Sequence, residues 1–252
     1  MNEENEKKDI SKLIFRPLSP LYFFMIFLWT FLLFPFLILT GNVFVRLLGI
    51  PPFITFIIFM LSLFGSYVNI PIMEVVSTEP IIALREVTFF GVRWTIPEFE
   101  VRRKRTIVAL NVGGALVPLI VSIYLLVFVI PCSEANLFVA YTKIFLALAI
   151  VTLIVHAVAT PVKGLGIATP AFLPPFITAL TSLMLYRLYV PTNPFIIAYV
   201  AGTLGTLLGA DILNLDKVSR LGAPLVSIGG AGTFDGVYLT GLIAIFLVLI
   251  LI

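Results

Sequence analysis

The stretch LFVAYTKIFLALAIVTLIVHAVA, residues 137–159, decides the class of fold. It contains no acidic residue, and Lys143 and His156 are its only basic ones. At a rise of about 1.5 Å per residue, roughly 20 apolar residues are enough to cross the hydrocarbon core of a bilayer. The stretch is therefore predicted to be a membrane-spanning α-helix.

The composition of the whole chain agrees with a membrane protein. Of its 252 residues, 60% are hydrophobic and 12% are charged, and the mean hydropathy is +1.15. Soluble domains carry about a quarter charged residues because they must wet their surface, so a soluble fold is excluded. The bilayer is the expected partner, nucleic acid is not, and the oligomeric state is left open. One Cys and one His cannot form a Cys- or His-based metal site, and no cofactor is expected.

Similar apolar runs predict an all-α integral membrane protein with about seven transmembrane helices. Residues 1–18 are predicted to be a cytoplasmic tail and residues 19–252 a single polytopic membrane domain. A fifth span is expected to end near Tyr189. The other spans are expected at about 20–40, 53–67 with a continuation toward Ile72, 107–130, 137–159, 194–213 and 234–252, so that Asn69 and Asn111 lie at the inner ends of spans two and three.

Basic residues collect on alternate sides of these spans. Lys and Arg are frequent in the tail and in the loop after span two, and Lys163, Lys217 and Arg220 lie on the same side. The other side holds only Arg46, Lys143 and Arg187. Because cytoplasmic loops carry an excess of Lys and Arg, the N-terminus is predicted inside and the C-terminus outside the plasma membrane.

The loop over residues 73–106 differs in character from the spans around it. Strand-forming residues flank the turn-prone Phe90-Gly91, which predicts a small β-hairpin-like insertion between spans two and three on the cytoplasmic membrane surface. Phe89, Phe90 and Trp94 are expected at the level of the lipid headgroups. Two further segments, 160–176 and 222–233, are rich in Pro or Gly and are predicted to be broken or re-entrant.

Five polar residues are predicted to converge at one depth near the cytoplasmic side. Ionisable and amide side chains are costly inside a membrane, so their positions point to function. Asp211 and Asp235 are the central pair of the predicted site, as catalytic or ion-binding acids. The other three, expected around this pair as binding residues, are His156, Asn69 and Asn111.

Structural roles compete with this hypothesis. Asp235 precedes the last span and can cap it, and Asp211 can be wetted by headgroup water. The amides and the histidine can join helices through interhelical hydrogen bonds. Glycines at 202, 205 and 209 lie on one face of span six and favour close helix packing there.

Several stretches resemble a family of uncharacterised archaeal and bacterial multi-pass membrane proteins, defined as a domain of unknown function. The resemblance implies the membrane class and leaves the activity open. It is carried by GSYVNIPI (65–72), HAVATPVKGLGIATPAFLPPF (156–176), AYVAGTLGTLLGADILNL (198–215) and SIGGAGTFDGVYLTGLIA (227–244).

The two aspartates also resemble those of intramembrane aspartyl proteases of the presenilin and signal-peptide-peptidase type. In that family one Asp lies on an inward-running helix and the other, in a Gly-x-Gly-Asp motif, begins the next helix. Asp211 and Asp235 match in order and direction. The chain departs from the family pattern because Phe234 replaces the second glycine and no later helix carries a Pro-Ala-Leu motif.

Three functions remain open from the sequence. Transport of a small solute or ion would use the acids and the interrupted segments beside them. Proteolysis of a transmembrane peptide would use Asp211 and Asp235 as a dyad that shares one proton. A non-catalytic membrane scaffold would use the 73–106 insertion as its docking surface.

Overall fold

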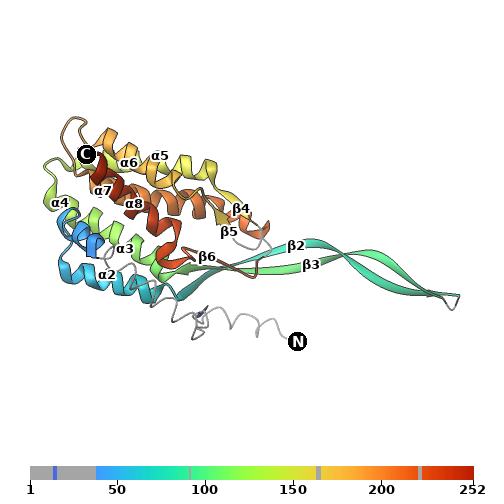
Figure 1. The fold of residues 1–252 in the computed structure, drawn as a ribbon. Coiled ribbons are helices and arrows are strands. Elements are labelled where there is room, and N and C mark those ends of the chain that lie inside the picture. The colour runs from blue at the N-terminus through green and yellow to red at the C-terminus, as the bar shows by residue number, and fades with distance from the viewer. Residues whose placement is uncertain (1–13, 16–37, 91, 163–165, 221–222) are drawn as a thin grey trace.

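The computed structural model describes residues 14–15, 38–90, 92–162, 166–220 and 223–252. These residues form a bundle of apolar helices and one long two-stranded ribbon that extends from one end of the bundle (Figure 1). We call this the hairpin end, and the opposite end, which holds the C-terminus, the loop end. Apart from Ile14–Phe15, the predicted tail lies outside the described residues, as does most of the predicted first span, although residues 38–46 are helical.

Helices coincide with every predicted span after the first. The third span is one continuous run, Val112–Ser133, in which π-helical turns precede α3 (Val117–Tyr124) and α4 (Ile130–Ser133). The sixth is α7 (Pro194–Thr206), continued by a π-helical turn over Leu207–Asp211 and a 3₁₀ stretch over Ile212–Arg220. The others are α2 (Pro52–Gly65), α5 (Leu137–Val158), α6 (Leu173–Leu185) and α8 (Gly236–Leu251).

The outer surface of the bundle is apolar. In the described part of the chain, three helical runs are long and apolar enough to cross a membrane: Val112–Ser133, Leu137–Val158 and Pro194–Lys217. Phe128 and Leu153 are 61% and 67% exposed on the outside of two of them. Large exposed apolar surfaces mark contact with membrane or protein. The helices therefore fit insertion into a membrane, whereas the seven-span topology and its orientation stay predictions.

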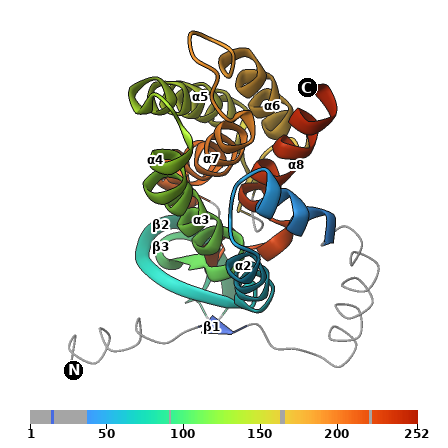
Figure 2. The same ribbon diagram turned by 90° about the vertical axis from the view of Figure 1, so that its left-hand side faces the viewer.

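Helix α7 occupies the centre of the bundle. It packs against α3, α5, α6 and α8, which surround it in the end-on view (Figure 2). Nearly all of its side chains are buried, and these include the polar side chains of Tyr199, Thr203 and Thr206. The bundle thus buries polar side chains beside a large apolar core and also exposes apolar side chains on its outside, which is unusual for a soluble protein.

The ribbon consists of β2 (Val68–Phe89) and β3 (Val92–Asn111), which pair antiparallel along their whole length. The prediction of a hairpin that turns at Phe90 is confirmed, but the insertion is longer than predicted. The strands replace the expected end of span two and start of span three, because Pro71 and β-branched residues favour extended backbone.

The ribbon runs away from the helices and twists about itself (Figure 1). Its predicted place on the cytoplasmic membrane surface stays a prediction. Phe90 is 93% exposed at the turn, and the side chains of Phe89 and Trp94 lie outside those that the structure describes.

Short strands also form in both interrupted segments. β6 (Leu225–Ile228) pairs parallel with the root of β3, and β1 (Ile14–Phe15) pairs with the root of β2. β4 (Thr160–Val162) and β5 (Gly166–Ala168) form a separate antiparallel pair. The described residues of 160–176 and 222–233 thus interrupt the helices with strands and turns, as predicted. Re-entry into a membrane stays a prediction.

Candidate functional site at the hairpin end

The predicted site residues all lie at the hairpin end, but in three separate groups. Asn69 and Asn111 form the root of the ribbon, His156 lies on α5, and Asp211 and Asp235 lie at the facing ends of α7 and α8. Each group has its own hydrogen bonds and is described in turn.

The two asparagines lie opposite each other on β2 and β3, not on helices as predicted. Nδ2 of Asn111 donates to Oδ1 of Asn69 (3.1 Å) and to the carbonyl of Ser66 (2.9 Å). Oδ1 of Asn111 accepts from the backbone N–H of Gly114 (2.8 Å) and so caps the run Val112–Ser133. Ser227 of β6 also donates to Oδ1 of Asn69 (2.5 Å). The pair therefore joins the ribbon, β6 and the end of α2.

Position 114, close to this asparagine pair, requires glycine. A Cβ atom on Gly114 would lie 2.2 Å from the carbonyl oxygen of Gly229 and 2.6 Å from that of Gly232. The start of the Val112–Ser133 run and the loop after β6 are therefore in direct backbone contact. Together with the capping bonds, this contact gives Asn69 and Asn111 a structural role at the joint between ribbon and bundle.

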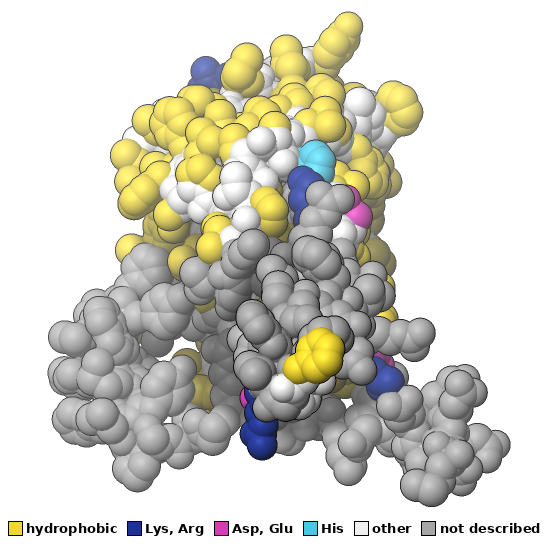
Figure 3. Space-filling model, turned by 90° about the vertical axis from the view of Figure 1, so that its right-hand side faces the viewer, with side chains coloured by type: hydrophobic (Ala, Val, Ile, Leu, Met, Phe, Trp, Pro, Cys, Tyr) yellow, Lys and Arg dark blue, Asp and Glu magenta, His cyan; other side chains and the backbone are white. Residues whose placement is uncertain are grey.

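His156 belongs to a chain of polar side chains that the sequence hypothesis did not include. Nδ2 of Asn214 lies 3.2 Å from Nδ1 of His156, and Nζ of Lys217 donates to Oδ1 of Asn214 (2.5 Å). Because an ammonium group only donates, Oδ1 of Asn214 faces Lys217, and Nδ2 of Asn214 faces Nδ1 of His156. Basic, acidic and histidine side chains lie near one another on this face (Figure 3).

Asn214 is fully buried and also holds the end of α7. Its Nδ2 donates to the carbonyls of Gly209 and Ala210, each at 2.9 Å, immediately before Asp211. The signal that could have found it is an amide three residues after Asp211 in the apolar run ADILNL, where polar groups are costly.

Asp211 is the last residue of the π-helical turn that follows α7. It is half-buried, and no hydrogen-bond donor among the described residues reaches its carboxylate. π-Turns inside helices occur frequently at functional sites, because their i→i+5 bonds change the direction of the side chains that follow.

Asp235 is the N-cap of α8, as one of the structural alternatives predicts. Its Oδ1 accepts from the backbone N–H of Val237 (3.0 Å) and its Oδ2 from that of Ala231 (3.3 Å). The negative charge also complements the positive end of the helix dipole. Capping therefore engages both oxygens of this carboxylate.

The two acidic side chains are close enough for the charge of one to act on the other. A Cβ atom on Gly236 would lie 3.8 Å from Oγ1 of Thr169 and 4.0 Å from Cγ2 of Thr206, so the start of α8 faces the end of α7. The hydroxyl of Thr206 is buried and has no hydrogen-bond partner in the described part of the chain. We define the acidic site as Asp211, Asp235, Thr206 and Thr169.

The chemistry of the acidic site favours a proton or a small cation. Two carboxyl groups offer oxygen atoms, and no basic side chain within the described ranges forms an ion pair with either acid. No three His, Cys, Asp or Glu side chains lie close enough together to hold a metal ion, as far as the structure describes the chain.

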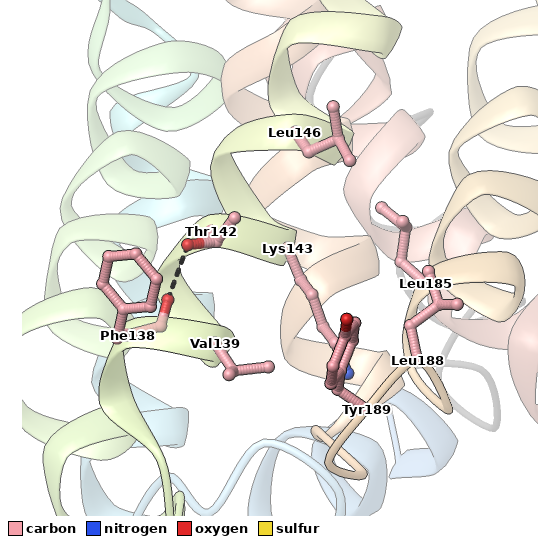
Figure 4. A pocket seen from close by; sticks show the side chains of 8 residues that line it. All are labelled: Phe138, Val139, Thr142, Lys143, Leu146, Leu185, Leu188 and Tyr189. Atoms are coloured by element: carbon pink, nitrogen blue, oxygen red, sulfur yellow. Dashed lines mark hydrogen bonds between the residues drawn. The ribbon is translucent and has the colours of Figure 1, made fainter.

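A pocket at the loop end lacks comparable chemistry. It has a volume of about 350 Å³ and lies between α5 and α6, where leucine, valine and aromatic side chains line it (Figure 4). The hydroxyl of Thr142 donates to the carbonyl of Phe138 (2.7 Å), and the ammonium group of Lys143 is bound to backbone carbonyls. The pocket therefore offers apolar surface and no unbound charge.

Fold and site together define a helical protein with an apolar exterior and an acidic site at one end of its central helix. The chain belongs to the family described as "Protein of unknown function (DUF1614)", whose model matches residues 63–247. No curated protein and no solved structure matches the chain. The predicted membership of an uncharacterised family is confirmed, and none of the comparisons supports the resemblance to presenilin-type proteases.

Proposed function

We propose that the protein moves a small ion or solute across the membrane and that the acidic site binds the ion. The observation that carries the proposal is the carboxylate of Asp211, which is half-buried and has no donor among the described residues. It lies in Pro194–Lys217, the most buried of the three membrane-length runs in the described part of the chain. An ionised group in such a place is costly unless it is paired. A bound proton or small cation removes that cost, so the site favours binding of positive charge.

The surroundings of the acidic site support transport. Helix α7 is interrupted next to Asp211 by a π-turn, and the segments around β4–β5 and β6 interrupt the helical pattern nearby. Transporters place binding sites where helices are interrupted, because helix ends and bare backbone there can face the ion.

Aspartyl proteolysis is the second candidate, and the electrostatic proximity of Asp211 and Asp235 favours it. A dyad that shares a proton needs both carboxyl groups to hold the attacking water. Both oxygens of Asp235 accept backbone N–H bonds, which leaves that residue less able to do so. Transport is therefore the better-supported function.

The test uses the purified full-length chain in sealed lipid vesicles. Uptake of radiolabelled sodium and the internal pH are followed for the parent, for Asp211→Asn and for Asp216→Asn, an exposed acid on the adjoining 3₁₀ stretch. We expect Asp211→Asn to reduce the flux of the transported cation about tenfold or more, since it removes the carboxylate of the acidic site that has no donor among the described residues. Asp216→Asn should resemble the parent.

Two results would contradict transport. One is a parent protein that moves neither cation, and the other is equal flux in the parent and Asp211→Asn. Cleavage of a synthetic transmembrane peptide by the parent, lost in both Asp211→Asn and Asp235→Asn, would establish the protease instead.

A further inference from the structure

We infer that two copies of this chain associate through the ribbon, by packing an apolar face of one ribbon on the same face of the other. The inference goes beyond the proposed function and does not depend on it, because it concerns the ribbon and not the acidic site. It comes from the register of β2 and β3, which decides which residues share a face.

Beyond its root the ribbon has only two strands. β1 pairs with β2 at Val68 and Asn69, and β6 pairs with β3 over Ile107–Leu110. Between Val75 and Phe89, no third strand joins β2 and β3 in the described structure. A two-stranded hairpin is only marginally stable alone in water, because it has no second layer against which to bury a face. A layer packed on one face would therefore stabilise this part of the ribbon.

One face of the ribbon is apolar over three successive pairs of residues. Residues alternate between the two faces along each strand, and residues directly opposite each other on neighbouring strands share a face. The three pairs that follow one another on this face are Pro80 with Val101, Ile82 with Phe99, and Leu84 with Pro97. We call these six residues the apolar face. Contiguous apolar residues on an unpaired face mark a surface of contact.

The opposite face carries charges over the same length. Glu100 and Glu98 lie on it, opposite Ile81 and Ala83. The next pairs in the two directions are Glu79 with Arg102 and Arg85 with Ile96. An antiparallel sheet with one packed face and one face in water shows this alternation of apolar and charged residues. The pattern therefore predicts a partner on the apolar face and water on the other.

The two prolines of the apolar face disfavour a partner that extends the sheet. Proline has no N–H group, and in a strand it is found where that group would face away from the neighbouring strand. Pro80 thus removes a donor from the outer edge of β2, and Pro97 removes one from the outer edge of β3, since both stay in register with their partners. A strand added at either edge would lose a hydrogen bond there. The partner is therefore expected on the face and not at an edge.

The charges around the apolar face fit a second copy of the same face. On this face β2 carries two acidic residues, Glu74 and Glu86, and β3 carries the basic residues Arg93, Arg103 and Arg105. Nε of Arg105 lies 3.5 Å from Oε1 of Glu74, which agrees with their place on one face. Glu86 and Arg93 lie nearer the turn and are exposed. The face therefore has an acidic strand and a basic strand.

Two ribbons that pack face to face can point in the same direction or in opposite directions. When they point the same way, a two-fold axis along the ribbons places β2 of one copy over β3 of the other, so acidic residues meet basic ones. When they point in opposite ways, β2 lies over β2 and β3 over β3, and like charges meet. Because like charges repel across an interface, the charges select the arrangement in which both ribbons point the same way.

The membrane favours the same arrangement. Copies of a membrane protein insert in one orientation, which the distribution of Lys and Arg determines. The ribbon leaves one end of the helical bundle (Figure 1), so the ribbons of two inserted copies lie on the same side. Confinement in one bilayer also raises the effective concentration of one apolar face for the other. The second copy is thus the partner that both the charges and the geometry of insertion favour.

The experiment measures cross-linking of the full-length chain in lipid vesicles. Cys132→Ser removes the native cysteine, and Thr88→Cys places a single one at an exposed position near the turn, on the same face as the apolar residues. A short bis-maleimide then joins two copies where their cysteines are close. Ribbons that point the same way hold the two cysteines at one height, whereas opposed ribbons centred on Ile82 separate them by roughly 40 Å, at about 3.3 Å per residue.

The tested variant is Ile82→Lys, which places a charge at the centre of the apolar face. Its matched control is Ile81→Lys, the same change one residue earlier on the charged face, opposite Glu100. We expect Ile82→Lys to lower the cross-linked fraction about tenfold, because a lysine there would be buried between the ribbons without a partner. Ile81→Lys should resemble the single-cysteine parent.

Charge exchange tests the direction of the ribbons independently of the apolar residues. Glu86→Arg should lower the cross-linked fraction about twofold, because a basic residue then faces the basic strand of the second copy. Adding Arg93→Glu to this variant exchanges the two charges, and cross-linking should return to the level of the single-cysteine parent.

Equal cross-linking in Ile82→Lys and the single-cysteine parent would overturn the inference, as would equal losses in Ile82→Lys and Ile81→Lys. A parent that does not cross-link through Thr88→Cys would overturn the arrangement in which both ribbons point the same way. If Ile82→Lys does not yield folded protein, Ile82→Thr suits a strand, removes apolar surface and carries the same expectation of a loss. Ion flux is not measured, so each of these results leaves the proposed function standing.

Discussion

The two ends of the bundle use polar side chains in opposite ways. At the loop end, Nζ of Lys143 donates to the carbonyls of Tyr186 (3.0 Å) and Val190 (2.6 Å) and to Oγ1 of Thr192 (3.2 Å). All three N–H bonds of the ammonium group are therefore used. Oε1 of Glu134 likewise accepts from the backbone N–H of Asn193 (2.8 Å).

At the hairpin end, several buried polar groups keep unused capacity. In the part of the chain that the structure describes, no donor reaches the carboxylate of Asp211. Within the same residues, Oγ1 of Thr206 and Nδ2 of Asn69 have no hydrogen-bond partner. Buried polar groups are normally paired, and exceptions point to a role beyond stability. If the protein transports an ion as proposed, we expect the loop end to stay closed and the hairpin end to exchange with solvent.

The largest expected effect is on the activity of reporter fusions, which tests which end of the bundle faces the cytoplasm. The bias in Lys and Arg predicts that the C-terminus, at the loop end, lies outside. A reporter enzyme that is active only outside the cytoplasm should be active when fused after Ile252. The same reporter fused after Asp216, at the hairpin end, should be inactive. Activity of the second fusion alone would reverse the orientation.

The next effect is on the stability of the loop end. Lys143→Met removes the ammonium group and leaves three acceptors, in the 186–192 loop, without their donor. We expect a loss of about 2 kcal/mol in the free energy of unfolding, because unsatisfied acceptors near the surface are only partly rehydrated. Thermal unfolding in detergent measures it. Ion flux per folded molecule should not change, and a loss of flux would extend the functional site to the loop end.

A smaller effect on the free energy of unfolding distinguishes a capping role of Asp235 from a role in ion binding. Asp235→Ala should lower the free energy of unfolding by about 1 kcal/mol, because the N-cap bonds to Val237 and Ala231 are lost. Asp235→Asn should change the stability little, since Asn is also a good N-cap. Thermal unfolding of both variants decides this. Equal losses in the two variants would show that the charge, and not the cap, stabilises the start of α8.

The smallest expected effect on stability is at Asp211. Asp211→Asn should leave the unfolding temperature unchanged or raise it, because a half-buried carboxylate without a donor contributes no pairing energy. Its flux should nevertheless fall, as proposed above. A clear loss of stability in this variant would mean that Asp211 is structural, and would remove the contrast between the two ends.

Helix positions followed closely from the sequence, and the strands did so only in part. The predicted span 137–159 and helix α5 (Leu137–Val158) agree to one residue, because apolar residues in a long run favour a helix wherever the chain lies. The ends of spans two and three were predicted as helix, and the structure places Asn69 and Asn111 on strands. The pairing of β2 with β3 extends past the segment whose composition signals a strand, and such an extension depends on the partner strand.

The candidate site shows the same division. Sequence by itself determined that costly polar residues gather near the ends of apolar runs, and so predicted Asp211, Asp235 and His156 as candidate site residues. Only the tertiary structure decided that Asp235 is a cap, that Asn214 joins His156 to Lys217, and that Thr206 lacks a partner among the described residues. Composition and periodicity indicate the free-energy cost of placing each residue in a membrane. Which donor meets which acceptor depends on how helices distant in sequence pack together, and a single sequence does not contain that geometry explicitly.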